Sequence, residues 1–568
     1  MYGIKMLKIQ DGNIYADTPL LSAIITDGKI MSLTNKKTGT QLVNAELNKA
    51  PAMELVYANN QTEPIADSKN GSITAYQVNA KIIELRISGW YADSVMVIKE
   101  DPATGELLLT PSAYSARKGV RSIRFNISGI NRDLNIIAPI FQGINLKLND
   151  PLISNMRSPW PREWEAGFAI LQGNNEGFMV WTQDTQYRYK SIQFGHAEDI
   201  QTVGFEAESY GPLHANYSAG GLTWRIGIYE GDWHVPALKY RNWLWNAYDL
   251  NNRSRPHWVH EISFCACWLP VENAILDALA KRVKPSKTLL HIPNWRVDRY
   301  DQNYPDYIAS PEAEAFMKKA LSMGFHIAPH ANIFEIDPSN PAYELLGQFE
   351  YRDLETDQRL GWSVTVSEDG KRSVVRVPMA NRRLLNNREC NTMVKIHPAQ
   401  PMWHSILREN LQNAKRAYGL DCIFTDVSHN TFNLSNCLVD NTTSTEGAKI
   451  LQDYLSQIDD GLMLGGEGLN EITMQSQAFA QVHLFKSSGT SIAGLERTGG
   501  IDLGDFLWGK LCRSVGYNKI AGKDEDETLR MRIHEEHGTI PTISARSADE
   551  ILDPNPAVIH AFDMANQN

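Results

Sequence analysis

The hydrophobic pattern of the chain changes its period once, near residue 230, and this change limits the folds that the chain can adopt. Before that point, apolar residues alternate with polar ones or form short β-branched runs, for example at 94–99, 122–127, 177–182 and 222–229. Gly, Asn, Asp and Pro separate these runs, which is typical of strands joined by tight turns. We therefore predict an N-terminal β-sandwich over residues 1–233.

A helical segment follows the predicted sandwich. Leu238, Trp243 and Trp245 fall into a helical run that begins at Pro236. This pattern predicts a helix at about 234–248, within a linker that extends to residue 258.

From residue 262 onward, predicted strands and helices alternate at the spacing of β/α units. The strands are expected at 262–269, 288–292, 325–334, 422–426, 462–465, 482–485 and 539–543. The helices are expected at 271–283, 310–323, 404–418, 447–458, 471–479 and 557–565. Alternation over roughly 300 residues fits a (β/α)8 TIM barrel, which we place at residues 259–568.

A polar segment at about 336–400 interrupts the alternation after the third strand of the predicted barrel. It contains two hairpin-like pieces, at 362–366 and 373–377. Because the segment is too long for a plain connection, we interpret it as a functional insertion.

Two carboxylates come at the ends of neighbouring predicted barrel strands. Asp426 ends the run Cys422-Ile-Phe-Thr-Asp, and Glu467 stands between glycines after the apolar run at 462–465. Catalytic groups of TIM barrels gather at the carboxyl ends of the strands, and two facing carboxyls are what glycoside cleavage needs. Asp426 and Glu467 are therefore the predicted catalytic residues, although an Asp that only caps a loop is the alternative for Asp426. Glu471 is interpreted as a charge at the start of the next helix.

Further polar and aromatic residues follow the second and third predicted strands. After the second strand come Trp295, Asp298 and Asp301, where aromatic rings can stack on sugars and carboxylates can bind hydroxyl groups. After the third come His330 and Asn332, which share their parity with His326 and are predicted to point into the barrel. A solvated acidic loop and a buried, hydrogen-bonded histidine are the alternatives. His429, close behind Asp426, completes the predicted substrate-binding set.

The residues quoted so far resemble those of the endo-α-N-acetylgalactosaminidase and α-N-acetylgalactosaminidase families of glycoside hydrolases. The resemblance covers about residues 230–480. Four segments carry it, namely Tyr-Asp-x-x-Tyr-Pro-Asp-Tyr at 300–307, His-Ala-Asn-Ile-Phe-Glu at 330–335, Ile-Phe-Thr-Asp-Val at 423–427 and the Glu467 segment at 461–468. The Gly-Asp-Trp run at 231–233 is also similar to the joint between sandwich and barrel in related α-galactosidases.

The resemblance implies a β-sandwich followed by a TIM barrel, and a role for each matched residue. Asp426 matches the nucleophile and Glu467 the acid/base, while Asp301 and His330 match positions that hold the sugar. The implied activity is a retaining hydrolysis of α-linked galactose-type sugars, foremost α-N-acetylgalactosaminides. This chain departs from those families in its insertion at 336–400 and in the residues Ser428-His-Asn that follow Asp426.

Three other functions stay open at this stage. An α-galactosidase or an α-glucosidase would share the architecture and the reaction. A protein that binds carbohydrate without cleaving it could keep the barrel and its aromatic loops. A metalloenzyme has weaker support, because His534-Glu-Glu-His537 lacks the spacing of known zinc helices.

Charge and composition limit the classes of partner, compartment and cofactor that we expect. The formal net charge of −11 and the lack of a basic run argue against a nucleic-acid partner. No segment has the roughly 20 apolar residues of a membrane helix, and the six cysteines lie in apolar runs that suggest reduced core residues. A cytoplasmic enzyme is the expectation, with secretion as the alternative if a signal peptide has been removed. We expect no required cofactor and no catalytic metal, and a structural calcium ion held by loop carboxylates is an open alternative.

Overall fold

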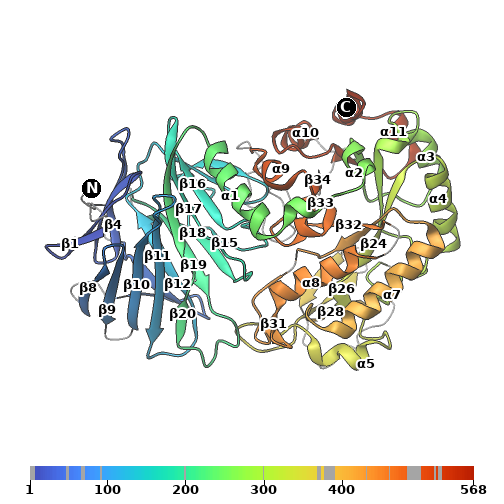
Figure 1. Ribbon diagram of the computed structural model, residues 1–568. Coiled ribbons are helices and arrows are strands. Elements are labelled where there is room, and N and C mark those ends of the chain that lie inside the picture. Colours follow the sequence, from blue (N-terminus) through green and yellow to red (C-terminus); the bar gives the residue numbers. More distant parts are fainter. Residues whose placement is uncertain are drawn as a thin grey trace. The chain divides into compact units, whose positions relative to one another are not determined.

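The computed structural model describes residues 7–45, 50–65, 71–89, 92–197, 200–298, 300–366, 372–376, 390–429, 431–458, 461–482, 500–516, 520–521 and 527–567. The chain divides into two compact units, Met1–Asp249 and Leu250–Asn568. The first consists of antiparallel sheets and the second of a parallel β-barrel (Figure 1). The predicted fold class, a β-sandwich followed by a TIM barrel, is therefore confirmed. Helix α1 (His234–Ala247), the last element of the first unit, lies where the sequence predicts a helix.

In the described part of the first unit, the strands form three sheets. The five-stranded sheet comprises β1 (Leu7–Gln10), β2 (Asn13–Asp17), β3 (Leu21–Thr26), β4 (Lys29–Asn35) and β5 (Gln41–Asn44). The six-stranded sheet has the order β15 (Arg157–Pro159), β18 (Lys190–Ala197), β19 (Ile200–Glu208), β12 (Val120–Ser128), β6 (Met53–Tyr57), β7 (Thr62–Pro64). The ten-stranded sheet runs β14 (Ile144–Lys147), β13 (Asn135–Ala138), β16 (Phe168–Gln172), β17 (Glu176–Trp181), β21 (Trp224–Glu230), β11 (Leu107–Ser115), β10 (Ala92–Glu100), β9 (Ile82–Gly89), β8 (Gly71–Asn79), and β20 (Ser218–Gly220) pairs with β11.

An aromatic layer joins the two larger sheets. Phe205 on β19 and Trp224 on β21 lie 5.3 Å apart between ring centroids, and Trp164 packs against both rings. On β10, every second residue from Ala92 to Glu100 is buried, as expected for a strand with one face on a core. The alternation in the sequence therefore reflects a sandwich with a shared apolar interior.

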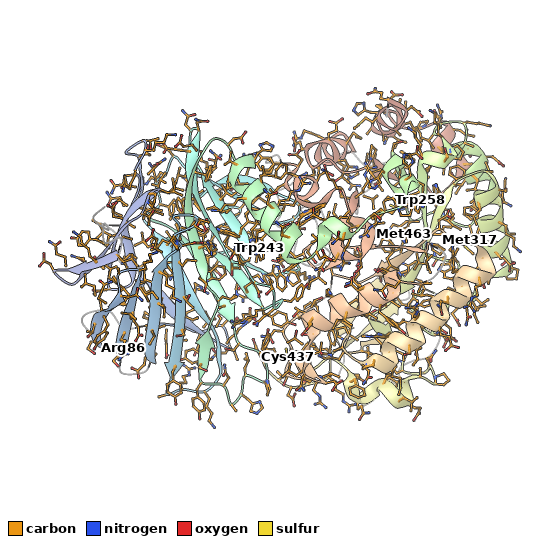
Figure 2. All side chains as sticks on the ribbon, viewed as in Figure 1. Arg86, Trp243, Trp258, Met317, Cys437 and Met463 are labelled. Carbon is orange, nitrogen blue, oxygen red and sulfur yellow. The ribbon has the colours of Figure 1, made fainter. Side chains whose placement is uncertain are left out.

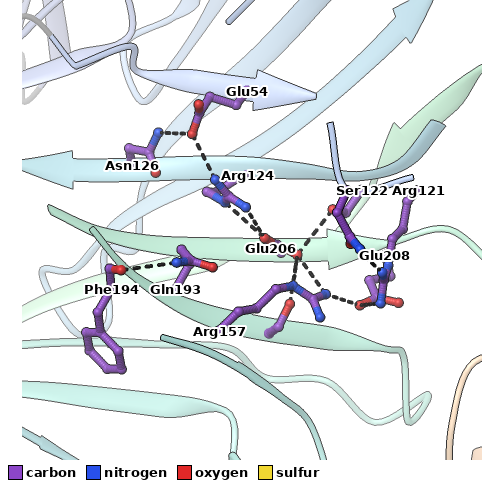
Figure 3. Close-up of polar contacts among 12 residues, drawn as sticks. Glu54, Arg121, Ser122, Arg124, Asn126, Arg157, Gln193, Phe194, Glu206 and Glu208 are labelled. Atoms are coloured by element: carbon purple, nitrogen blue, oxygen red, sulfur yellow. Dashed lines mark hydrogen bonds and ion pairs between the residues drawn. The ribbon is translucent and has the colours of Figure 1, made fainter. Parts of the chain in front are cut away.

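A buried ionic cluster crosses the six-stranded sheet (Figure 3). Glu206, whose side chain is fully buried, accepts hydrogen bonds from the guanidinium groups of Arg124 and Arg157 and from the hydroxyl groups of Ser122 and Ser191. Burial alone would raise the pKa of this carboxyl, but the two arginines hold it well below its usual value. The cluster thus buries a charged carboxylate and supplies it with hydrogen-bond donors and opposite charges.

Eight parallel strands form the barrel of the second unit. In ring order they are β22 (Phe264–Ala266), β23 (Thr288–Ile292), β24 (His326–Asn332), β29 (Cys422–Asp426), β32 (Met463–Glu467), β33 (Gln477–Val482), β34 (Arg513–Gly516) and β36 (Thr542–Ser544). A parallel bridge between Val515 and Ile540 connects β34 to the segment before β36, and the short β35 (Ile520–Ala521) also pairs with β36. All residues of β23 are buried, as is usual for a parallel strand that is covered on both faces.

Helices follow most of the barrel strands. They are α3 (Asn273–Leu279), α4 (Pro311–Ser322), α7 (Pro401–Tyr418), α8 (Ser444–Ser456), α9 (Leu503–Trp508), α10 (Glu527–Glu536), α11 (Ala548–Leu552) and α12 (Pro556–Gln567), whereas α2 (His257–Glu261) precedes the first strand. The predicted start of α4 is confirmed, because the Ser310 side chain accepts a hydrogen bond from the backbone N–H of Ala313. Trp258 and Met463 pack against the barrel core (Figure 2).

One predicted helix is wrong. Residues 471–479 do not form a helix but a 3-10 turn, Thr473–Gln475, followed by the sixth barrel strand, β33. All residues of β33 are buried, including the polar Gln477 and Gln481, and so short a buried segment has no periodicity that distinguishes a strand from a helix. The strand expected at 482–485 therefore begins earlier, and residues 483–485 lie outside the described residues.

The insertion after the third strand forms a small sheet of its own, with α5 (Tyr343–Leu346) beside it in the sequence. Its strand order is β25 (Glu335–Ile336), β28 (Cys390–Lys395), β26 (Gly361–Val366), β27 (Arg372–Arg376). The predicted hairpin is confirmed, because β26 and β27 pair in antiparallel fashion. Of the predicted insertion, residues 367–371 and 377–389 lie outside the described residues.

Five cysteines, Cys265, Cys267, Cys422, Cys437 and Cys512, are free and buried, as predicted.

No helix in the described part of the chain has both the length and the apolar composition that crossing a membrane requires.

Candidate active site

The two predicted catalytic carboxylates lie at the carboxyl ends of adjacent barrel strands. Asp426 is the last residue of β29, and Glu467 is the last residue of β32, which pairs directly with β29. Their side chains are only 14% and 10% exposed. The barrel therefore presents both carboxyls at the same end and largely removes them from water.

The two carboxyls interact electrostatically. Burial raises the pKa of Asp426, the nearby Glu467 carboxyl raises it further, and His330 opposes the rise. Since two close carboxylates resist simultaneous ionisation, the pair holds on to one proton to a higher pH than separate carboxyls would. A pair in which one member is ionised and the other protonated can combine nucleophilic attack with acid catalysis.

His330, the predicted sugar-binding histidine on β24, faces Asp426. Its Nε2 lies 3.5 Å from Oδ2 of Asp426, and its side chain is almost fully buried. Trp295 supports the backbone at His330, because its indole N–H donates a 2.6 Å hydrogen bond to the backbone carbonyl of His330. The Trp295 ring is fully buried, so the structure gives it a supporting place rather than the sugar-contacting face that the sequence suggests.

An aromatic wall borders the carboxylates. Tyr300 lies 4.9 Å from His330 and 5.8 Å from Trp268 between ring centroids. Burial raises the pKa of the Tyr300 hydroxyl, and the charges of Asp426, Asp301 and Glu467 raise it further, so these carboxyls lie within electrostatic reach of Tyr300. Trp268 has a φ of +56°, which is uncommon for a bulky residue and is often found at functional sites. This wall offers ring faces on which a sugar could stack.

Asp301, in the loop after β23, lies within electrostatic reach of this wall. Its carboxylate contributes to the raised pKa of Tyr300 and of Tyr304, and its φ of +59° places its backbone in the left-handed region. Asp298 is instead held by the loop itself, since it accepts a hydrogen bond from the side-chain amide of Asn303. The structure thus places Asp301 within electrostatic reach of Tyr300 and Tyr304 and ties Asp298 to Asn303.

Asn332 is fully buried and has a structural role at the end of β24. Its side-chain oxygen accepts hydrogen bonds from the backbone of Phe334 and Glu335, and its amide donates a 2.6 Å bond to the Glu335 carboxylate. Glu335 also forms a buried ion pair with Lys395, which comes from the insertion. Asn332 therefore shapes the strand end, and the structure shows no exposed surface on it for a sugar.

The three polar residues of β24 do not all face the carboxylates. His326 lies at the opposite end of the strand, where its Nδ1 is 3.0 Å from Asp421 and its ring stacks on Trp258. His326 and His330 do lie on the same face of β24, but four residues apart, so that they reach different ends of the barrel.

His429 lies beside Glu467. Its Nδ1 is 3.5 Å from Oε2 of Glu467, and its side chain is largely buried. The same carboxylate oxygen accepts a 3.0 Å hydrogen bond from the backbone N–H of Val427.

The sequence did not point to Val427, to Trp268 or to the Glu335–Lys395 pair as parts of the site. Of these, only Trp268 could have been found, because it lies at the end of a predicted barrel strand.

A metal centre has no support in the residues that the structure describes, where no three His, Cys, Asp or Glu side chains could hold an ion together. The histidines His534 and His537 of the suggestive motif are buried rather than on the surface, and Nδ1 of His537 lies 2.9 Å from the carbonyl oxygen of Ile533.

Comparisons with known proteins agree with this architecture. A family model described as "Domain of unknown function (DUF6259)" matches residues 221–443. No curated protein matches the chain. The α-N-acetylgalactosaminidase NagBb from Bifidobacterium bifidum, in complex with GalNAc, is similar in structure with a TM-score of 0.64 at 11% identity, over 99% of this chain and 92% of that chain. Its ligand-free form gives the same TM-score and identity, over 99% and 93%.

The GH36 α-galactosidase AgaB from Geobacillus stearothermophilus is also similar, with a TM-score of 0.47 at 9% identity, over 99% of this chain and 86% of that chain. The similarity to NagBb confirms, at the level of the fold, the resemblance that the sequence suggested to glycoside hydrolases with a sandwich and a barrel.

Proposed function

We propose that this chain is a retaining glycoside hydrolase that acts on α-linked galactose-type sugars, with an α-N-acetylgalactosaminide as the expected substrate. The observation that carries the proposal is the pair of largely buried, electrostatically coupled carboxyls at adjacent strand ends. The similarity of the fold to NagBb supports the choice of sugar.

In the proposed reaction the two carboxyls divide the work. The ionised Asp426 attacks the anomeric carbon and forms an ester to the sugar, while Glu467 gives its proton to the departing glycosidic oxygen. Glu467 then takes a proton from water, whose oxygen attacks the anomeric carbon and displaces Asp426 as a carboxylate. Over the two steps Glu467 regains the proton that it gave, and water is the only reactant besides the glycoside.

The surrounding residues favour this division. His330, 3.5 Å from Asp426, stabilises the ionised form of that carboxyl when its ring is protonated. The rings of Trp268 and Tyr300 offer an apolar border, and such faces suit the C–H groups of a sugar. Asp301 provides an oxygen acceptor for sugar hydroxyl groups near Tyr300.

A substrate panel tests the proposal. Purified protein is incubated with p-nitrophenyl α-N-acetylgalactosaminide, α-galactoside and α-glucoside, and release of nitrophenol is followed. The α-N-acetylgalactosaminide is expected to be cleaved with the highest kcat/KM. Preference for the α-galactoside or the α-glucoside would correct the sugar and keep the reaction, whereas binding of a sugar without release from any substrate would identify a non-catalytic binding protein.

The coupling of the carboxyls predicts opposite pH shifts in two variants. Because burial and Glu467 raise the pKa of Asp426, the acid limb of kcat/KM is expected above the ordinary range of an Asp, about pH 3.9. Glu467→Gln removes the negative neighbour and should move this limb to lower pH. His330→Asn removes the group that lowers the pKa of Asp426 and should move it to higher pH.

The measurement uses a 2,4-dinitrophenyl glycoside, because its leaving group needs no proton and keeps the Glu467 variant measurable. An acid limb that stays in place in both variants would contradict the assignment of Asp426 as the group that must be ionised.

A further inference from the structure

Three consecutive residues after Asp426 contact Glu467. The backbone N–H of Val427 donates to Oε2 at 3.0 Å, and Nδ1 of His429 lies 3.5 Å from the same oxygen. Between them, the Ser428 hydroxyl accepts a 2.8 Å hydrogen bond from the backbone N–H of Glu467 and donates a 3.0 Å bond to its carbonyl oxygen. The loop that follows one carboxylate thus holds both the backbone and the side chain of the other.

The local backbone is shaped for these contacts. Val427 has a φ of +52°, a conformation that a β-branched residue rarely adopts and that costs free energy. Such strain persists where the surrounding structure imposes it, and here it accompanies the N–H bond to Glu467.

The glycines beside Glu467 leave room for the loop. A Cβ atom at Gly466 would lie 2.5 Å from the Ser428 hydroxyl oxygen, and one at Gly468 would lie 2.5 Å from Cβ of His429. Gly468 also has a φ of +69°, which favours glycine. Larger residues at either position would displace the contacts with Glu467.

The contacts distinguish the two carboxyl oxygens of Glu467. Oε2 accepts the N–H of Val427, and the carbonyl oxygen of a carboxylic acid is a stronger acceptor than its hydroxyl oxygen. In a protonated Glu467 this bond therefore favours Oε2 as the carbonyl oxygen and Oε1 as the oxygen that carries the proton. This assignment gives the two oxygens separate tasks: Oε2 anchors the side chain, and Oε1 exchanges the proton.

We propose that Val427–His429 forms a clamp on Oε2 of Glu467, in which His429 is a positioning residue that directs Oε1 toward the glycosidic oxygen. The proposal rests on the proposed function and adds to it the atom that moves the proton and the residue that aims it. It differs from the direct substrate contact that the sequence suggests for His429. Among the described residues, Asp426 on β29 and Tyr300 in the loop after β23 also interact electrostatically with Glu467.

Leaving-group dependence tests the clamp in the full-length protein. His429→Ala should lower kcat/KM for a phenyl glycoside roughly 100-fold, the effect of a misplaced catalytic group. It should leave kcat/KM for the 2,4-dinitrophenyl glycoside nearly unchanged, since that leaving group needs no proton. His429→Asn, which can place a polar atom near Oε2, should restore part of the loss. Glu467→Ala should show the same dependence on leaving group, more strongly.

His326→Ala is the matched control, because this histidine also contacts a carboxylate on the barrel, Asp421, at 3.0 Å but at the opposite end of the strands. It should keep the wild-type response to the leaving group. An equal loss on both substrates in His429→Ala, or a rise in KM alone, would overturn the clamp. Failure of the proposed function would be recognised separately, because wild type would then cleave neither glycoside, or Glu467→Ala would lose no more activity on the phenyl glycoside than on the 2,4-dinitrophenyl glycoside.

Discussion

Replacing Asp426 by Ala is expected to lower kcat on an aryl α-glycoside by about 10⁴-fold or more, which is the loss seen when a covalent nucleophile is removed. The reason lies in the geometry. Asp426 ends β29 beside Glu467 and His330, and no other carboxylate contacts His330 in the described residues. Initial rates on the substrate selected by the panel measure the effect.

The stereochemistry of rescue makes this prediction sharper. Azide added to Asp426→Ala should attack the sugar from the side of the missing nucleophile and give a β-glycosyl azide. Azide added to Glu467→Ala should attack the covalent intermediate and give an α-glycosyl azide. If Asp426→Ala gave the α-azide and Glu467→Ala the β-azide, Glu467 would be the nucleophile and Asp426 the acid/base.

Asp421→Ala provides the control for the loss of a carboxylate from the same part of the chain. Asp421 directly precedes β29 and contacts His326 at the other end of the barrel, so this variant should retain turnover. Retained activity in Asp426→Ala would remove Asp426 from the mechanism.

Replacing Glu206 by Gln is expected to destabilise the protein by about 3–5 kcal/mol, because removal of one partner from a buried ion pair leaves the other partners uncompensated. Arg124 and Arg157 both donate to this carboxylate, and its side chain is fully buried. In calorimetry of the whole chain, a unit of this size should lose roughly 6–20 °C from its transition temperature.

The pH dependence of this loss follows from the lowered pKa of Glu206. A carboxyl with a lowered pKa in the folded state stabilises the fold above its unfolded pKa, near 4.3, and loses this contribution as the pH falls further. The difference between wild type and Glu206→Gln should therefore be complete at pH 7 and shrink below about pH 4.

Glu230→Gln is the matched control. Glu230 pairs with Lys37 in the same unit, but the two side chains are 43% and 75% exposed, and such surface pairs contribute little. Equal destabilisation by the two variants would show that burial of the Glu206 cluster is not what matters.

Much of the architecture could be predicted from the periodicity of the sequence. Alternating patterns such as that of β10 reflect one covered face, and mostly apolar, fully buried runs such as β23 reflect two covered faces. Residues 477–482 escaped prediction because a buried parallel strand and a buried helix share the same composition over so short a run.

The candidate site could be predicted only as far as strand ends determine it. Asp426, Glu467 and His330 come together because parallel barrel strands end on one face. The sequence could not tell that Trp295 and Asn332 would be buried, since burial depends on how the loops close over the strand ends. The contact of His429 with Glu467 depends on the backbone conformation of Val427, which is unusual for its residue type.

The pairing of Glu335 with Lys395 limits how the insertion can change. Glu335 follows the third barrel strand, whereas Lys395 belongs to the last strand of the insertion, and the two residues are direct neighbours in the register of β25 and β28. A shortened or transplanted insertion without Lys395 would leave a buried carboxylate close enough to Asp426 to influence its ionisation. Protein engineers who exchange this segment to alter specificity would therefore have to replace Glu335 in the same step.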